Sequence, residues 1–120
     1  MKILEINPMA KPRMTIGDRA GHRPIVKRYW QYKQDLQILA ACTNLFISDQ
    51  LTVIFYIKMP ASWSEKKKRE MFMKPHTQRP DLDNLIKGLQ DCLLVEDAHI
   101  WHYKDCRKLW AYEGRIEIGD

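Results

Sequence analysis

The most regular pattern of apolar and polar positions in the chain lies between residues 82 and 94. At about 100° per residue, one face of a helix there would collect five apolar residues: Leu85, Ile86, Leu89, Cys92 and Leu93. The opposite face would carry Asp83, Lys87 and Asp91. Because Pro80 disfavours helical backbone at the residue before it, this helix is expected to begin one or two residues after that proline.

Two further helices are indicated. An apolar stripe with three- and four-residue spacings predicts a helix from about Tyr29 to Phe46 and assigns the stripe to the core or to a subunit contact. The stripe consists of Tyr29, Tyr32, Leu36, Leu39, Thr43 and Phe46. The sequence Ser62-Trp63-Ser64-Glu65 has the spacing of a capping box, so a short helix is expected to follow it through Met73. That helix carries four consecutive basic residues: Lys66, Lys67, Lys68 and Arg69.

Strands are expected in four places. β-Branched and aromatic residues from Leu51 to Lys58 predict a central strand that is apolar on both faces. Shorter strands are expected at Lys2–Ile6 and Arg115–Ile118, and a long bent one within His99–Tyr112. The predicted fold class is therefore α/β (α+β), with a small mixed β-sheet of about four strands, two main helices and the short basic helix.

Composition and charge fit one domain that spans residues 1–120. The chain is 45% hydrophobic and 29% charged, and it is long enough to bury a core. Its 20 Lys and Arg against 15 Asp and Glu give a net charge of +5, which hints at a polyanionic partner. Three cysteines without C-x-x-C spacing indicate free thiols. With no signal peptide and no apolar run of transmembrane length, we expect a cytoplasmic protein without a membrane partner.

Basic residues gather in two segments that could contact DNA phosphates. Between residues 11 and 28, six Lys and Arg face one acid in a long irregular stretch, which favours phosphate contact over a merely solvated loop. For the short helix, a nucleic-acid surface and a solvated surface are equally good interpretations. The predicted DNA contacts are Lys11, Arg13, Arg19, Lys66, Lys67, Lys68, Arg69 and Lys108.

The acidic residues at the start of the helix predicted between residues 82 and 94 suggest a metal site. Asp81 and Asp83 lie two residues apart. Carboxylates that lie close together repel one another, which raises their pKa, and a divalent cation removes this repulsion. Hard oxygen donors suit Mg²⁺ or Mn²⁺. Alternatively, either Asp could simply cap the helix, and Lys87 could be an ordinary i,i+4 partner of Asp83. Zinc is not expected, because His99 and His102 would point to opposite faces of a strand.

Several stretches of the chain resemble the RusA family of Holliday-junction resolvases, which is common in phages and prophages. From Met59 to Ile118 these are MPASWSEKKKRE, KPHTQRPDLDNLIKGLQDCL, EDAHI, RKLW and GRIEI, and Lys11-Pro12-Arg13 is similar to the family's basic KPR element. The specific part is D-x-D-N-x-x-K at a helix start followed by an acidic pair. The family usually has two aspartates where this chain has Glu96-Asp97.

The resemblance implies a homodimeric, Mg²⁺-dependent endodeoxyribonuclease, with Mn²⁺ as a substitute, that cuts four-way DNA junctions by paired nicks in recombination and repair. It implies 5′-phosphate products and a bacterial host cell. It assigns metal binding and catalysis to Asp81, Asp83 and Asp97 and a catalytic role to Lys87. Asp91 also has a family counterpart, without an assigned role.

Two alternatives remain open on the sequence. One is another metal-dependent nuclease of branched DNA, although a restriction-like P-D…(D/E)-x-K order fails because Glu65-Lys66-Lys67 precedes Pro80-Asp81. The other is a non-catalytic protein, either a junction-binding protein with structural acids or a protein-interaction module. A pure DNA binder gains nothing from carboxylates beside a phosphate path, since they repel it.

Overall fold

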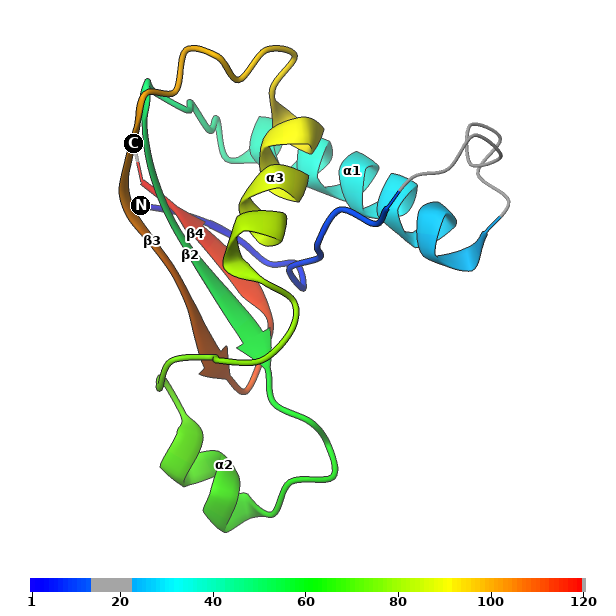
Figure 1. The fold of residues 1–120 in the computed structure, drawn as a ribbon, viewed down its shortest axis with the longest axis vertical. Helices are drawn as coiled ribbons and strands as arrows, with labels where there is room; N and C mark the ends of the chain where they lie inside the picture. Colours follow the sequence, from blue (N-terminus) through cyan, green and yellow to red (C-terminus); the bar gives the residue numbers. More distant parts are fainter. Residues whose placement is uncertain (14–22, 120) are drawn as a thin grey trace.

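The computed structural model describes residues 1–13 and 23–119. Along the chain the elements are β1 (Lys2–Leu4), α1 (Pro24–Cys42), β2 (Gln50–Lys58), α2 (Glu65–Met71), α3 (Leu82–Leu93), β3 (His102–Ala111) and β4 (Arg115–Ile118). Helices α1 and α3 lie on one side of the sheet, whereas α2 projects beyond its end (Figure 1). This arrangement confirms the predicted α+β class with two main helices and a short basic one.

The four strands form one mixed sheet in the order β1-β4-β2-β3. Strand β2 runs parallel to β3, from Gln50 opposite His102 to Lys58 opposite Ala111, and antiparallel to β4. Strand β1 pairs antiparallel with β4 at the other edge. The central position predicted for β2 is therefore confirmed.

The core lies between one face of the sheet and the two long helices. Phe55 on β2 is fully buried there with Leu36 of α1 and Leu89 of α3. On the other face of the sheet a smaller cluster contains Ile54, Tyr56, Leu109 and Ala111. The guanidinium of Arg115 lies 3.7 Å from the ring centre of Tyr56 and covers it. Strand β2 is thus buried on both faces, as its composition predicted.

Helix α1 differs from its prediction at both ends. It begins at Pro24, earlier than the predicted Tyr29, because proline at the first helical turn has no N–H to leave unsatisfied. It ends at Cys42, and Asn44 follows in left-handed backbone (φ 53°). The prediction that Phe46 continues the stripe was wrong, since its side chain is 72% exposed beyond the helix. Tyr29, Tyr32 and Leu36 are buried in the core and Leu39 packs against it, so this part of the stripe is not a free subunit contact, whereas Thr43 lies at the C-cap of the helix.

Three other boundaries also shift. Strand β1 ends at Leu4, not Ile6. The cap of α2 is Ser64, whose hydroxyl accepts a hydrogen bond from the backbone N–H of Lys67 (3.2 Å), so the predicted capping box at Ser62 was wrong. The helix ends at Met71, and Met73 follows with a φ of 65°.

The segment after α2 adds a short pairing to the outer edge of β3. Met73 N–H donates to the Trp110 carbonyl (2.9 Å), Trp110 N–H to the Lys74 carbonyl (3.0 Å), and His76 N–H to the Lys108 carbonyl (3.0 Å). The His76 ring packs on Trp110 with 4.3 Å between ring centres. This segment therefore fixes the path of the chain from α2 to α3.

Two smaller expectations can be compared with the structure. All three cysteines, Cys42, Cys92 and Cys106, are free, as predicted. Within residues 1–13 and 23–119, no helix combines the length and the apolar character needed to cross a bilayer.

Candidate active site

The start of α3 is held in place from β3. The ammonium of Lys108 donates hydrogen bonds to the backbone carbonyls of Gln78 (2.5 Å) and Pro80 (2.7 Å), the two residues that flank Arg79. Lys108 was predicted as a DNA contact. Here its charge is instead directed to the loop that delivers Asp81 to the helix.

The carboxylates of Asp81 and Asp83 are not used to cap α3. Asp81 occupies the N-cap position with extended backbone, yet its side chain makes no capping hydrogen bond. Asp83 accepts only from the backbone N–H of its neighbour Asn84 (3.0 Å) among the described contacts. Both residues are exposed. The helix-cap alternative therefore loses its support, and these oxygens remain available to a ligand.

A shallow hollow of about 270 Å³ lies beside this exposed face of α3. Its lining comprises Asp83, Asn84, Ile86, Lys87, Gln90 and Tyr103. Gln90 donates a hydrogen bond to the Tyr103 hydroxyl (3.3 Å), so the hollow lies between α3 and β3.

Lys87 belongs to an ion-pair network at the other end of this face. Its ammonium lies 3.3 Å from Oδ1 of Asp91 and 3.6 Å from Oδ2 of Asp97. Hydrogen bonding to Asp91 and the charges of Asp91 and Asp97 raise the pKa of Lys87, so it is cationic at neutral pH. Among the described residues its i,i+4 partner is Asp91, so the suggested pair with Asp83 was wrong.

The second oxygen of Asp91 is also occupied. The ammonium of Lys11 lies 2.6 Å from Oδ2 of Asp91, although the two residues are 80 positions apart in the sequence. Partial burial alone would raise the pKa of the Asp91 carboxyl, but hydrogen bonds from Lys11 and Lys87 outweigh it and hold that pKa below its ordinary value. Asp91 therefore stays charged between two lysines.

A glycine that the sequence analysis did not single out brings Lys11 to this position. A Cβ at Gly88 would lie 3.0 Å from the Met9 carbonyl oxygen and 3.1 Å from the Lys11 nitrogen. The backbone of residues 9–11 therefore rests directly on α3, and the Tyr29 hydroxyl donates to the Gly88 carbonyl from α1 (3.4 Å). The available signal was a glycine inside an amphipathic helix, which often marks close backbone approach.

The predicted metal ligands share the right chemistry but are not gathered into one cluster. Within the described part of the chain, no three His, Cys, Asp or Glu side chains are arranged to hold a metal ion. Asp81 and Asp83 lie at the start of α3, whereas Asp97 follows the helix and contacts Lys87. The oxygen-only donor set nevertheless fits Mg²⁺ or Mn²⁺ better than softer metals.

The other predicted DNA contacts lie in two places. Arg13 is exposed, with its carbonyl accepting from Arg23 (2.7 Å), and Arg19 lies outside the described residues. On α2, Lys66, Lys67 and Arg69 are exposed, and Lys68 lies 3.9 Å from Glu65. The Lys67 ammonium stands 4.2 Å from the ring centre of Trp63. Helix α2 therefore presents its basic residues on an arm away from the sheet (Figure 1).

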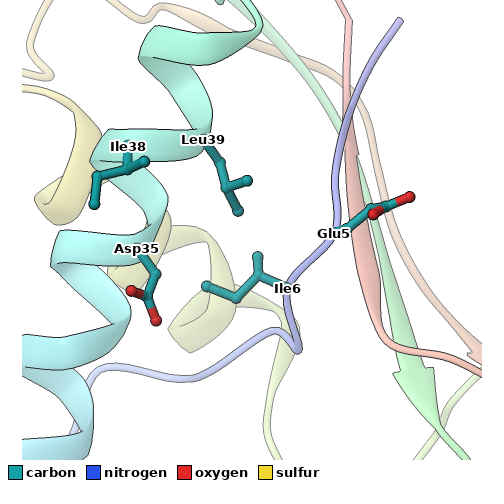
Figure 2. Close-up of a pocket in the computed structure, with 5 residues that line it drawn as sticks. All are labelled: Glu5, Ile6, Asp35, Ile38 and Leu39. Atoms are coloured by element: carbon teal, nitrogen blue, oxygen red, sulfur yellow. The ribbon is translucent and has the colours of Figure 1, made fainter.

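A second hollow, of about 240 Å³, lies between α1 and the chain after β1 (Figure 2). Figure 2 shows Ile6 and Leu39 pointing toward each other across it, while Glu5 points away. Asp35 at its rim accepts a hydrogen bond from Gln31 (2.9 Å) within α1. Its apolar lining and nearby carboxylates do not suit a phosphate, so the site is assigned to α3.

Comparison with known proteins gives one match. The family model described as Endodeoxyribonuclease RusA matches residues 5–119, nearly the whole chain. No curated protein and no solved structure gives a significant match. The matched range includes α3, the acidic residues on it, Asp97 and the Lys11 segment. The chain therefore belongs to the RusA family of endodeoxyribonucleases.

Proposed function

We propose that this RusA-family protein is a divalent-metal-dependent nuclease that resolves four-way DNA junctions in recombination and repair. The observation that carries the proposal is the exposed face of α3. There Asp81 and Asp83 present carboxylates that the helix does not use for capping, and a cationic Lys87 follows one turn later. The basic arm of α2 precedes this face, and the Lys11 segment rests on it.

In the proposed mechanism Asp81, Asp83 and Asp97 would hold Mg²⁺, or Mn²⁺ in its place, which would supply Lewis-acid activation for the hydrolysis. Lys87 places its ammonium near the scissile phosphate, where it stabilises the negative charge that develops during attack. Breaking the P–O3′ bond leaves a 5′-phosphate and a 3′-hydroxyl. Basic side chains on α2 and Arg13 bind flanking phosphates and orient the strand.

We also propose that the active form is a homodimer. A four-way junction has approximate two-fold symmetry, and one site cuts one strand. A dimer with two-fold symmetry would present two sites to two symmetry-related strands and so produce paired nicks. Sedimentation of the protein alone and with a junction measures this directly.

The test is cleavage of a synthetic four-way junction by purified protein, with and without Mg²⁺. Matched linear duplex and three-way substrates separate junction resolution from general cleavage of branched DNA. Paired nicks on two symmetry-related strands of the junction, which depend on Mg²⁺ and are absent from the linear and three-way substrates, would support the proposal. Equal cleavage of three-way substrates would indicate a broader branched-DNA nuclease. Tight junction binding with no cleavage at any metal concentration would indicate a binding protein.

A further inference from the structure

We propose that Asp91 is a positioning residue that holds Lys87 for catalysis, and that Lys11 acts through Asp91 instead of binding DNA. The inference rests on the proposed function, because it concerns the lysine of that site. Each oxygen of the Asp91 carboxylate faces one ammonium, with Lys11 at 2.6 Å and Lys87 at 3.3 Å. One carboxylate thus joins a segment near the N-terminus to the middle of α3.

The two carboxylates that contact Lys87 are not equivalent. Asp91 lies on the same helix one turn after Lys87, and its side chain is 25% exposed. Asp97 lies in the irregular segment after α3, is 35% exposed and is also a proposed metal ligand. Asp91 makes the shorter contact with Lys87, 3.3 Å against 3.6 Å for Asp97, and it does so from a fixed position on the same helix, so we assign the orientation of the lysine to Asp91.

Lys11 is placed for this role by its backbone. The backbone of residues 9–11 lies 3.0–3.1 Å from the position that a Cβ at Gly88 would occupy, so this close packing fixes where the backbone of Lys11 lies relative to α3. Its ammonium then points at Asp91, and the side chain is 37% exposed. Because this short ion pair already balances the charge of Lys11 against a carboxylate, we assign Lys11 to the positioning of Asp91 and not to DNA binding.

The alternatives predict different measurements. If Asp91 were a metal ligand, its loss would shift the Mg²⁺ dependence of cleavage. If Lys11 bound phosphate, its loss would lower the dependence of affinity on salt by about 0.9 in the slope of log K against log salt. A positioning role predicts neither change, and predicts a slower cleavage step at saturating protein and Mg²⁺.

The experiment is a double-mutant cycle in single-turnover cleavage of a four-way junction. Asp91→Asn should slow cleavage about 10–100-fold, the range found for outer partners that orient active-site ligands. Lys11→Met should slow it severalfold in the wild-type background and no further in the Asp91→Asn background. Asp91→Glu, which keeps the charge on a longer side chain, should restore part of the rate.

Matched controls separate this role from folding and from charge. Asp105→Asn removes one carboxylate from an exposed pair with Arg107 (3.0 Å) on β3, and it should leave the rate unchanged. Thermal unfolding of the same variants gives a second cycle that needs no activity. In it, Lys11→Met and Asp91→Asn should be non-additive, because each removes the same ion pair.

Three results would overturn the inference. These are additive rate effects of Lys11→Met and Asp91→Asn, a tenfold shift of the Mg²⁺ midpoint in Asp91→Asn, or a flatter salt slope in Lys11→Met. In each case wild-type cleavage would still stand, so only the roles of Asp91 and Lys11 would fail. A wild-type protein that cuts no junction would overturn the proposed function itself and the positioning role with it.

Discussion

At the scale of single residues, the same face of α3 contains side chains with different partners. Asp83 is exposed and accepts from a neighbouring backbone N–H, whereas Lys87 is held by two carboxylates. The spacing of residues in the sequence predicted that Asp83 and Lys87 share one face of α3, and this prediction was correct. It could not predict the Lys11–Asp91 pair, because nothing local in the sequence connects residues on separate elements.

Removal of the Lys87 charge should affect chemistry more than folding. The side chain is 53% exposed, so Lys87→Ala should unfold at nearly the wild-type temperature and bind junctions almost as well. Loss of one preorganised charge at the reacting phosphate should slow single-turnover cleavage about 10²–10³-fold. Lys87→Arg should rescue only in part, because a planar fork does not replace a compact ammonium. A rate for Lys87→Ala within about threefold of wild type would leave Lys87 as a simple ion-pair partner.

Asp83→Asn tests the proposed metal ligand at the start of α3. The change keeps the size of the side chain and removes one negative charge near the phosphate path. Nicking should disappear at all Mg²⁺ concentrations, while junction affinity in a gel-shift or fluorescence titration should stay the same or increase. Full Mg²⁺-dependent cleavage by this variant would rule out Asp83 as a ligand.

At the scale of elements, the predictions succeeded where a local signal marked a boundary. Pro80 and a strongly amphipathic pattern located α3, and β-branched residues located β2. The predicted start of helix α1 was several residues too far along the chain, because Pro24 was taken as part of a loop although proline is common in the first turn of a helix. The resemblance predicted that Asp81, Asp83 and Asp97 form one metal site, whereas among the described residues these three side chains are not gathered into one cluster.

Gly88→Ala tests how tightly the Lys11 segment rests on α3. Alanine normally favours a helix over glycine by about 1 kcal/mol, but here the new methyl would meet backbone atoms at 3.0–3.1 Å. Backbone yields less readily than a side chain, so overpacking at a typical cost of about 1–3 kcal/mol should win. Thermal unfolding should show a decrease of several degrees, whereas Gln34→Ala on the exposed face of α1 should show little change. A stabilised Gly88→Ala protein would show that residues 9–11 move away easily.

His76 should make stability depend on pH. Burial against Trp110 and the charge of Lys108 lower the pKa of its imidazole in the folded protein. The unfolded chain therefore takes up a proton first, so stability should decrease as the pH falls below about 6.5 and level off below the folded pKa. Denaturant unfolding at several pH values would measure this, and His76→Phe should remove that component. An unchanged pH profile in His76→Phe would assign the effect to other groups.

At the scale of the whole molecule, the acidic residues proposed for the active site and the basic run on α2 lie on different elements. Helix α3 carries Asp83 and Asp91, and Glu96 and Asp97 follow it. The basic run 66–69 lies on α2, which projects beyond the end of the sheet (Figure 1). Such a distribution suits a substrate that bridges both regions. The net charge of +5 indicated a negatively charged partner, but only the fold could show where each charge of the protein lies.

DNA affinity should accordingly depend steeply on salt. If the basic residues neutralise about six phosphates, log K should fall against log salt with a slope near −5. Charge reversal at Arg13 or Lys67 should flatten the slope and weaken binding to all DNA structures alike, since every DNA structure presents phosphates to these side chains. Fluorescence anisotropy from low to moderate salt measures this, and slopes unaffected by either reversal would mean that these charges only face solvent.

The pairing of residues 73–76 with β3 has a consequence for how the protein behaves at high concentration. The free edge of a sheet offers backbone donors and acceptors to any passing strand, and such edges are common starting points for aggregation. Here the chain that carries α2 to α3 occupies hydrogen-bonding positions along that edge at Trp110 and Lys108. The segment that delivers the acidic helix to its place therefore also covers this part of the β3 edge against pairing with other copies.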